Sequence, residues 1–140
     1  ISSGQEEKGR EEIKNFLVNN SKVWNAWFLL GWGLRRLERF SDAKQAFLEA
    51  LKLGGDSNSD TYNELSLCYV QEKNFDEAEK CLIKALSIEP ESTKIMSNLG
   101  YLALSKGDIQ GARNYFTTVL EFDPKDKIAA SELYKLEQEN

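Results

Sequence analysis

Histidine is absent from this chain of 140 residues, and its absence excludes several kinds of reactive site. A chain without histidine cannot build a Ser/His/Asp or Cys/His nucleophilic centre or the zinc-binding helix of a metalloprotease. The sequence also lacks CxxC pairs, GxGxxG and GxxxxGKS/T loops and a complete EF-hand loop. Its 23 acidic residues are spread at spacings typical of solvated helix faces. We therefore expect a protein that is not an enzyme and that uses no cofactor and no metal.

Basic charge and long apolar runs are also scarce. The chain holds 18 Lys and Arg residues against 23 Asp and Glu residues, a net charge of −5, whereas nucleic-acid-binding domains normally present a basic face. The longest apolar run, residues 26–34, is about half of the ~20 residues that a transmembrane helix needs. We therefore expect no nucleic-acid partner and no membrane span.

Cysteine is limited to Cys68 and Cys81. Both fall in helical segments and not in a spaced disulfide framework, so the sequence favours buried free thiols and a reducing, cytoplasmic location. A bridge between the two helices that carry them is the alternative. No secretory signal is visible at the start of the sequence and no Met stands first, so we expect the natural chain to be longer on that side.

A pattern of large and very small residues occurs three times along the chain. The three copies are Trp27, Leu30, Gly31, Leu34, Ala43, Phe47 and Ala50; Tyr62, Leu65, Ser66, Tyr69, Ala78, Leu82 and Ala85; and Met96, Leu99, Gly100, Ala112, Phe116 and Val119. The step from Ala43 to Ala78 is 35 residues, and the step from Ala78 to Ala112 is 34 residues. In a helical hairpin, small residues let two backbones approach closely while large residues fill the gaps.

This repeat resembles the tetratricopeptide repeat, a helix-turn-helix unit of about 34 residues with a W-x2-L-G-x2-Y, A-x3-F and P signature. The resemblance covers nearly the whole chain. It implies an all-α fold, a right-handed superhelical α-solenoid of helical hairpins. We expect complete repeats at residues 23–57, 58–91 and 92–125.

The two ends carry further helical patterns. Gly9, Ile13 and Phe16 lie 34 positions before residues of the first repeat, so residues 1–22 resemble the second helix of a truncated repeat. A capping helix outside the repeat pattern is the alternative. Residues 126–140 predict a C-terminal capping helix, because the end of a repeat stack must present polar residues to water. Its apolar stripe should consist of Ile128, Ala129, Leu133 and Leu136. A half-repeat that docks on a further domain is the alternative there.

Residue types at the segment ends predict where the helices begin and end. Asn74 and Glu77 resemble a capping box. The helix that follows should end at residue 88, before Pro90, and Ser92 or Thr93 should open the next one. Residues 107–108 should form a turn. The other helices are expected over residues 23–38, 41–53, 60–73 and 126–138.

The resemblance implies a binding surface, since the first helices of tetratricopeptide hairpins line a concave groove that usually holds a peptide or a partner helix. Counting the family's groove positions from Trp27 as the fourth residue of its repeat places the candidate binding residues. They are Asn25, Phe28, Trp32, Arg35, Arg36, Asn63, Leu67, Gln71, Lys94, Asn98 and Tyr101.

One subfamily grips the carboxylate end of chaperone tails with Lys, Asn and Arg side chains, and this sequence departs from its pattern. Phe28 and Trp32 stand where that subfamily has Lys and Asn in its first repeat. Glu64 takes the place of the second-repeat Asn, and Asn98 takes that of the third-repeat Arg. Lys94 alone agrees, so we do not expect a chaperone-tail clamp.

An apolar stripe takes the place of that clamp, because Trp32, Leu67 and Tyr101 share one repeat position and Phe28 precedes Trp32 by one turn. Such residues either fill the contact between neighbouring helices or bind an apolar peptide or amphipathic helix. We assign Trp32 and Tyr101 to the groove surface and Phe28 to packing against the missing half of the truncated repeat. Trp24 and Trp27 are assigned to the core.

Arg35, Arg36 and Arg39 form a basic edge beside this stripe. They are either simply solvated or able to hold an acidic peptide. Overall, we expect a scaffold or adaptor that binds another protein or peptide. Two alternatives stay open. The first is self-association through the face around Ile13, Phe16 and Trp24, giving a monomer or weak homodimer, and the second is a targeting arm of a larger protein.

Overall fold

The computed structural model of this protein describes residues 9–12 and 23–138, and over these residues every regular element is a helix. The elements that follow residue 22 are α2 (Trp24–Arg36), α3 (Phe40–Lys52), the short 3-10 helix η1 (Gly55–Ser57), α4 (Ser59–Gln71), α5 (Phe75–Ile88), α6 (Thr93–Ser105), α7 (Ile109–Phe122) and α8 (Lys127–Gln138). The helix ends foreseen from the sequence lie within two residues of these bounds. The predicted stop before Pro90 is confirmed.

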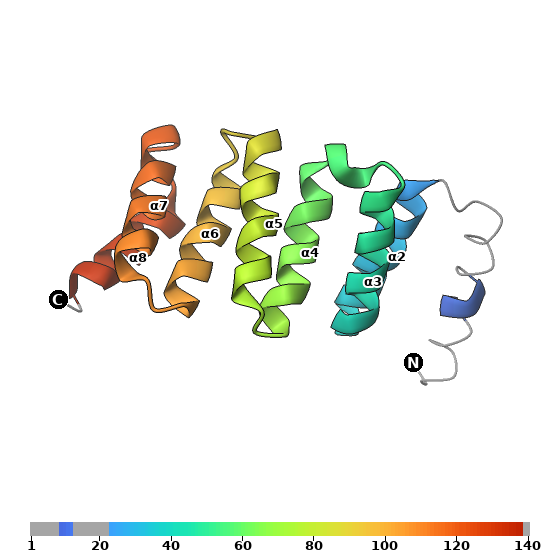
Figure 1. Cartoon of the computed structure of the whole chain (residues 1–140). Helices are drawn as coiled ribbons and strands as arrows, with labels where there is room; N and C mark the ends of the chain where they lie inside the picture. Colours follow the sequence, from blue (N-terminus) through green and yellow to red (C-terminus); the bar gives the residue numbers. More distant parts are fainter. Residues whose placement is uncertain (1–8, 13–22, 139–140) are drawn as a thin grey trace.

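The helices form a row of antiparallel pairs. Figure 1 shows α2 and α3 at one end, then α4 with α5 and α6 with α7, and finally α8 at the other end. Each helix packs mainly on its neighbours along the chain, and α2 also touches α4. Because each pair buries its apolar side chains against the next one, the core is a continuous layer along the row.

Close approach of the two helices within a pair depends on the small residues of the sequence pattern. A Cβ atom added to Gly31 would lie 2.8 Å from Cε1 of Phe47, and one added to Gly100 would lie 2.7 Å from Cζ of Phe116. Both phenylalanine side chains are fully buried. The rings of α3 and α7 therefore occupy the space that the glycines of α2 and α6 leave open.

The turns inside the three pairs share one backbone feature. Glu38, Lys73 and Gly107 occupy the same place in each turn and have positive φ angles of 63°, 60° and 80°. Glycine accepts this left-handed conformation readily, whereas a residue with a Cβ atom is strained there by about 1–2 kcal/mol. The turn predicted at Gly107 and Asp108 is confirmed.

The capping box predicted at Asn74 and Glu77 is wrong. The Asn74 side chain makes no capping hydrogen bond. The backbone N–H of Asn74 donates instead to the carbonyl oxygen of Tyr69 at 2.9 Å, so it is not available to the Glu77 side chain. In contrast, the predicted start at Ser92 is confirmed, because its hydroxyl oxygen accepts a hydrogen bond from the N–H of Ile95.

Cys68 and Cys81 are free, buried thiols in the packing of the middle repeat, as the sequence favoured. Burial raises the pKa of each thiol to about 12, with the neighbouring carboxylates of Glu64 and Glu77 adding to the effect. Trp24 and Trp27 are only partly buried, so their assignment to the core holds in part. Trp27 packs on the first core cluster, whereas Trp24 lies over the Gly54–Gly55 backbone.

The two ends of the row differ from the predicted patterns in detail. The apolar stripe predicted for α8 is confirmed at Ala129 and Leu136, which are buried, and is wrong at Ile128, which is 57% exposed. Residues 9–12 are helical, and Arg10 pairs with Asp42 of α3. Ile13 and Phe16 of the truncated repeat lie outside the described residues. No helix within the described ranges is long and apolar enough to cross a membrane.

Candidate partner-binding pocket

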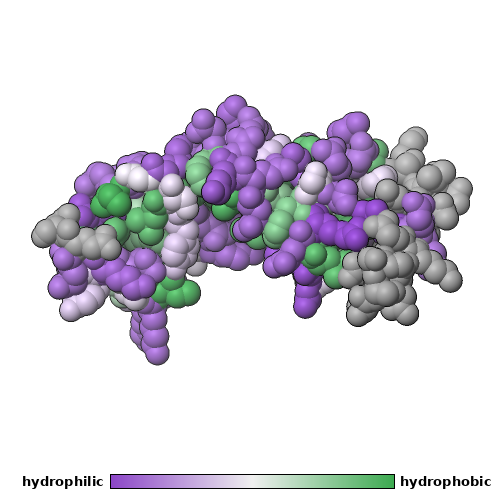
Figure 2. Space-filling view, turned by 90° about the horizontal axis from the view of Figure 1, so that it is seen from below, coloured by the Kyte–Doolittle hydropathy of each residue, from purple (hydrophilic) through white to green (hydrophobic). Residues whose placement is uncertain are grey.

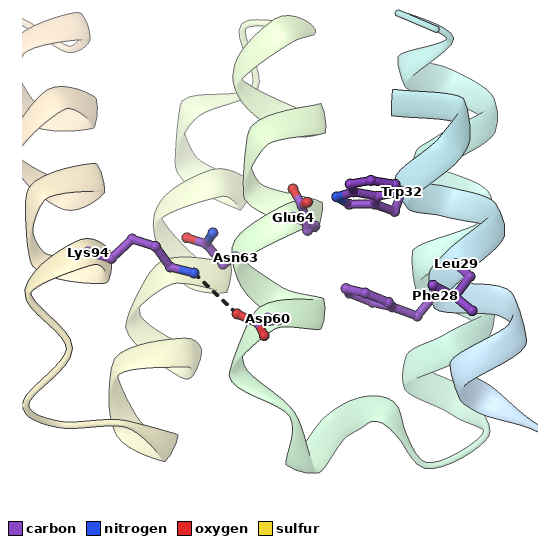
Figure 3. Close-up of a pocket in the computed structure, with 7 residues that line it drawn as sticks. All are labelled: Phe28, Leu29, Trp32, Asp60, Asn63, Glu64 and Lys94. Carbon is purple, nitrogen blue, oxygen red and sulfur yellow. Dashed lines mark hydrogen bonds and ion pairs between the residues drawn. The ribbon is translucent and has the colours of Figure 1, made fainter. Parts of the chain in front are cut away.

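A pocket of about 380 Å³ lies between the first helices of the three pairs. Its lining residues come from α2, α4 and α6, and they are Phe28, Leu29, Trp32, Asp60, Asn63, Glu64 and Lys94. Figure 3 shows the aromatic side chains of α2 projecting toward α4, with the carboxylates of α4 opposite them and Lys94 reaching across from α6. Four of the predicted groove residues, Phe28, Trp32, Asn63 and Lys94, therefore share one site.

The aromatic wall consists of Phe28 and Trp32, which lie one turn apart on α2. The ring of Phe28 is partly buried and packs within its own repeat, with its centroid 5.6 Å from that of Phe47 and 6.3 Å from that of Trp24. These contacts of Phe28 lie inside the first repeat, and its expected packing against the missing half of the truncated repeat stays a prediction. Trp32 is 39% exposed, so it can contact a ligand.

An arginine forms an ion pair with Glu64, one of the two acidic residues that line the pocket. Glu64 is 8% exposed, and Arg35 contacts both of its carboxylate oxygens, with Nε 2.8 Å from Oε2 and Nη2 3.1 Å from Oε1. This two-point contact fixes the carboxylate and neutralises its charge. Arg35 therefore supports the pocket wall, and it does not form the free basic edge that the sequence suggested.

Arg36 also has a partner in the structure. Its guanidinium carbon lies 4.8 Å from the centroid of the Trp32 ring, the geometry of a cation–π contact. Together with Trp32, Glu38 and Phe40, the two arginines surround a second, shallower hollow at the end of α2. Trp32 is thus shared by both hollows.

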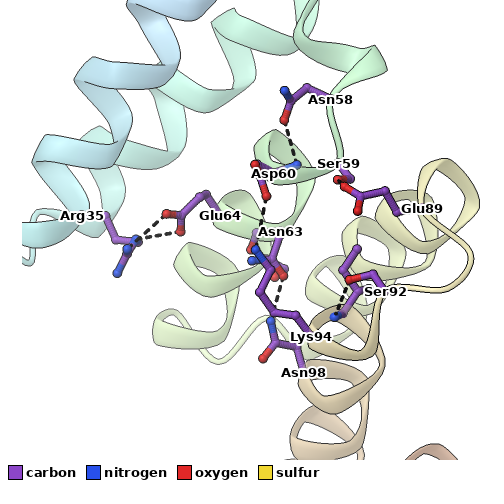
Figure 4. Close-up of polar contacts among 12 residues, drawn as sticks. Arg35, Asn58, Ser59, Asp60, Asn63, Glu64, Glu89, Ser92, Lys94 and Asn98 are labelled. Atoms are coloured by element: carbon purple, nitrogen blue, oxygen red, sulfur yellow. Dashed lines mark hydrogen bonds and ion pairs between the residues drawn. The ribbon is translucent and has the colours of Figure 1, made fainter. Parts of the chain in front are cut away.

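Polar contacts join α4 to α6 across the floor of the pocket, as Figure 4 shows. The amide nitrogen of Asn98 donates to Oδ1 of Asn63 at 2.8 Å, and Asn63 is nearly buried. Nζ of Lys94 lies 3.3 Å from Oδ1 of Asp60, and both of these side chains are more than half exposed. The Asn63–Asn98 contact is therefore a fixed part of the floor, while the Lys94–Asp60 pair can separate at little cost.

Tyr101 lies outside this pocket, although it shares the repeat position of Trp32. Its ring packs edge-on against Phe116, with centroids 5.3 Å apart, and its hydroxyl donates to Oε1 of Glu132 on α8 at 3.5 Å. Partial burial and the neighbouring Glu132 carboxylate raise the pKa of the Tyr101 hydroxyl. Asn25, Leu67 and Gln71 are likewise absent from the lining of this pocket.

Two lining residues, Leu29 and Glu64, were missed as binding candidates, whereas Asp60 lies at a position that the repeat count places in the groove. Asp60 and Glu64 are four residues apart and therefore share one face of α4, a spacing that the sequence does display. Leu29 is 62% exposed and precedes Trp32 by three residues. The signal that the sequence offered was a leucine directly after one aromatic residue and three residues before another.

Comparison with protein families identifies the repeats. A tetratricopeptide repeat model matches residues 24–57, and a second model of the same name matches residues 59–92 and 93–126. The chain belongs to the tetratricopeptide repeat family. Its repeats are similar to those of human tetratricopeptide repeat protein 6, with 32% identity over 102 residues, which is 67% of this chain and 18% of that protein.

Other curated relatives have varied names. Heat shock protein STI1 of Saccharomyces cerevisiae is 28% identical over 90 residues, which is 64% of this chain and 15% of that protein. A Caenorhabditis elegans relative named as a protein O-mannosyl-transferase is 29% identical over 84 residues, covering 60% of this chain and 12% of that protein. The chain thus spans less than a fifth of the length of these three relatives.

Solved structures share the fold. The MamA protein superimposes with a TM-score of 0.77 and 26% identity, over 85% of this chain and 64% of that one. The first tetratricopeptide domain of Spaghetti, solved with an HSP90 peptide, gives a TM-score of 0.75 and 20% identity, over 82% of this chain and 90% of that one. The fold is therefore an all-α, right-handed superhelical solenoid, of a family whose repeats generally serve as protein-interaction modules.

Proposed function

We propose that this tetratricopeptide domain is a non-enzymatic scaffold or adaptor that binds a peptide or helical segment of another protein in its concave groove. The main binding site is the pocket lined by Phe28, Trp32, Asn63 and Lys94, and the groove continues past Leu67 toward Tyr101. The proposed repeats comprise residues 23–57, 58–91 and 92–125, followed by a capping helix over residues 126–140. The location proposed from the two buried thiols is the cytoplasm.

The observation that carries this proposal is the combination of an exposed tryptophan and a fixed polar floor in one pocket. Trp32 is 39% exposed beside the partly buried Phe28, and aromatic residues in partly desolvated pockets dominate the binding energy of many interfaces. The Asn63–Asn98 hydrogen bond leaves the amide nitrogen of Asn63 able to donate to a peptide carbonyl oxygen. An apolar wall with a few positioned polar groups is typical of ligand pockets.

The pocket chemistry argues against the chaperone-tail ligand of the HSP90 peptide complex. An acidic tail entering this pocket would meet Asp60 and Glu64, and the positive charge of Lys94 already faces Asp60. Aromatic faces carry negative electrostatic potential and also disfavour a carboxylate. We therefore propose a different class of peptide ligand for this domain.

The proposal is tested with peptides selected from a random phage-displayed library on the immobilised domain. Trp32→Ala should weaken the binding of a selected peptide at least tenfold while the unfolding curve stays close to that of the wild type. Tyr134→Ala is the matched control, since Tyr134 is 64% exposed on α8, outside the pocket. Equal dissociation constants for the wild type and Trp32→Ala would contradict the proposal, as would a large loss of stability in Trp32→Ala.

Self-association of the domain is the alternative function, and it can be tested with the same purified protein. The face proposed for it is the one around Ile13, Phe16 and Trp24, of which Trp24 is partly buried and the other two residues lie outside the described ranges. Groove binding requires no dimer, so we propose a monomer or weak homodimer. Sedimentation equilibrium that shows a tight dimer, together with loss of peptide binding as the dimer forms, would replace the proposed function with self-assembly.

A further inference from the structure

The walls of the pocket share an electrostatic preference. The faces of the Phe28 and Trp32 rings carry negative potential, and Asp60 and Glu64 bring carboxylates to the opposite side. Lys94 is the one cationic residue among the lining side chains that the structure describes. Because Arg35 neutralises Glu64, a positively charged guest would meet the ring faces on one side and the exposed carboxylate of Asp60 on the other.

Trp32 already holds a guanidinium group in this structure. Arg36 stacks on its ring at 4.8 Å, and Arg36 does not line the pocket, so this contact lies outside the pocket. The part of the ring that borders the pocket is left for a ligand. An arginine of a partner can thus make the same kind of contact that Arg36 makes.

The two carboxylates differ in how freely they can change partner. Arg35 holds Glu64 at two points, and the Glu64 side chain is only 10% exposed. Asp60 has a single contact of 3.3 Å with Lys94, and its side chain is 57% exposed. Exposed pairs of this kind contribute little to stability. Asp60 can therefore exchange Lys94 for an incoming cation, whereas Glu64 keeps its arginine and shapes the wall.

We propose that this pocket binds the side chain of an arginine in the partner peptide, with the guanidinium group against the Phe28 and Trp32 rings and paired with Asp60. This inference rests on the proposed function and names the residue that the groove selects. Arginine suits the site better than lysine, because its planar guanidinium group stacks on aromatic rings and donates to a carboxylate at the same time. Charge complementarity also fits a basic segment to a domain of net charge −5.

The test compares peptides selected from the random library on three versions of the domain. Arginine should be enriched at one position of the peptides selected on the wild type and on Tyr134→Ala, and the enrichment should be lost on Asp60→Asn. Replacing that arginine with citrulline, which keeps the shape and removes the charge, should weaken binding about tenfold. Trp32→Leu, which keeps an apolar wall without an aromatic face, and Asp60→Asn, which removes the carboxylate, should each reduce the preference for the arginine peptide over the citrulline peptide, because each variant retains only one of the two groups that recognise the charge.

The other outcomes overturn the inference and separate it from the proposed function. Selected peptides without arginine that still depend on Trp32 would refute the arginine site and leave groove binding intact. Equal binding of the citrulline and arginine peptides to the wild type would have the same meaning. If no peptide is selected, or if binding is indifferent to Trp32, both the inference and the proposed function are wrong.

Discussion

Trp32 in the first repeat and Tyr101 in the third occupy the same repeat position and are almost equally exposed, at 39% and 40%. Their surroundings are different. Trp32 borders a pocket with Phe28 beside it and two carboxylates opposite. Tyr101 packs on Phe116 and donates its hydroxyl to Glu132 of α8. Exposure and repeat position therefore do not locate a pocket residue, because the neighbouring element decides whether an aromatic ring faces a pocket or the next helix.

The helix pairs beneath these two residues are built alike. In each, a glycine of the first helix lies under a fully buried phenylalanine of the second, Gly31 with Phe47 and Gly100 with Phe116. The difference between the two ends of the row thus lies in the surface and not in the core. Figure 2 shows apolar residues of one face as separate patches in a mainly hydrophilic surface. An apolar patch alone is therefore a weak indicator of function here.

The largest expected effects come from the two buried phenylalanines. Phe47→Ala and Phe116→Ala should each lower the free energy of unfolding by about 3–5 kcal/mol, since both rings are fully buried. Phe47 also supports Phe28, so Phe47→Ala should weaken peptide binding in urea-free buffer, whereas Phe116→Ala should not. Urea unfolding followed by circular dichroism and peptide titration measure both. Equal loss of binding in the two variants would show that the ends of the row do not differ as described.

The Arg35–Glu64 ion pair beside the pocket has no counterpart in the third repeat, because Leu104 occupies the repeat position of Arg35 there. Arg35→Met would leave the nearly buried Glu64 without its partner and should cost about 2 kcal/mol. Adding Glu64→Gln should recover part of that loss. Arg36→Met, the control on the same turn, should change stability by less than about 1 kcal/mol. Similar unfolding curves for Arg35→Met and Arg36→Met would contradict the conclusion that Arg35 stabilises the pocket through Glu64.

Two glycines of α2 offer a matched test of the close helix contact. Gly31→Ala should destabilise the domain by about 1–2 kcal/mol, because the added Cβ would meet the Phe47 ring at 2.8 Å. Gly33 has nothing within 4 Å of such a Cβ, so Gly33→Ala should raise the unfolding free energy by about 0.5–1 kcal/mol. Gly100→Ala should behave like Gly31→Ala. A higher melting temperature for Gly31→Ala than for Gly33→Ala would contradict the packing described.

The smallest expected effect concerns the tyrosine hydroxyl. Tyr101→Phe removes a long, partly exposed hydrogen bond to Glu132 and should cost about 0.5 kcal/mol or less. Hydrogen exchange of the α8 amides should become faster, while peptide binding stays unchanged. Weaker peptide binding with unchanged exchange in α8 would place Tyr101 in the ligand site and remove the contrast with Trp32.

Much of the fold could be predicted because one pattern is repeated. The Gly31–Phe47 and Gly100–Phe116 pairs are visible as spacings in the sequence, and Pro90 marks the end of α5. The capping box at Asn74 failed for a local reason, since the backbone of the preceding turn had already taken the N–H group that it needs. Residue type alone does not show that competition.

The pocket could be predicted only in part. Repeat counting located Phe28, Trp32, Asn63 and Lys94, because groove positions follow from the period. It could not show that Arg35 pairs with Glu64 or that Tyr101 donates to Glu132 of α8, since both contacts depend on which side chains of different repeats meet. The exposure of Ile128 likewise depends on how α8 is turned against α7.

The most direct measurement is the position of a bound peptide on the domain, mapped by chemical-shift changes of backbone amides and tryptophan indole N–H groups. With a library-selected peptide, the largest shifts should fall on Phe28, Trp32 and Asn63, with little change at Tyr134. Shifts centred on α5 around the exposed Ile83, or on α8 around Tyr134, would contradict the assignment of the binding site to the pocket between α2 and α4.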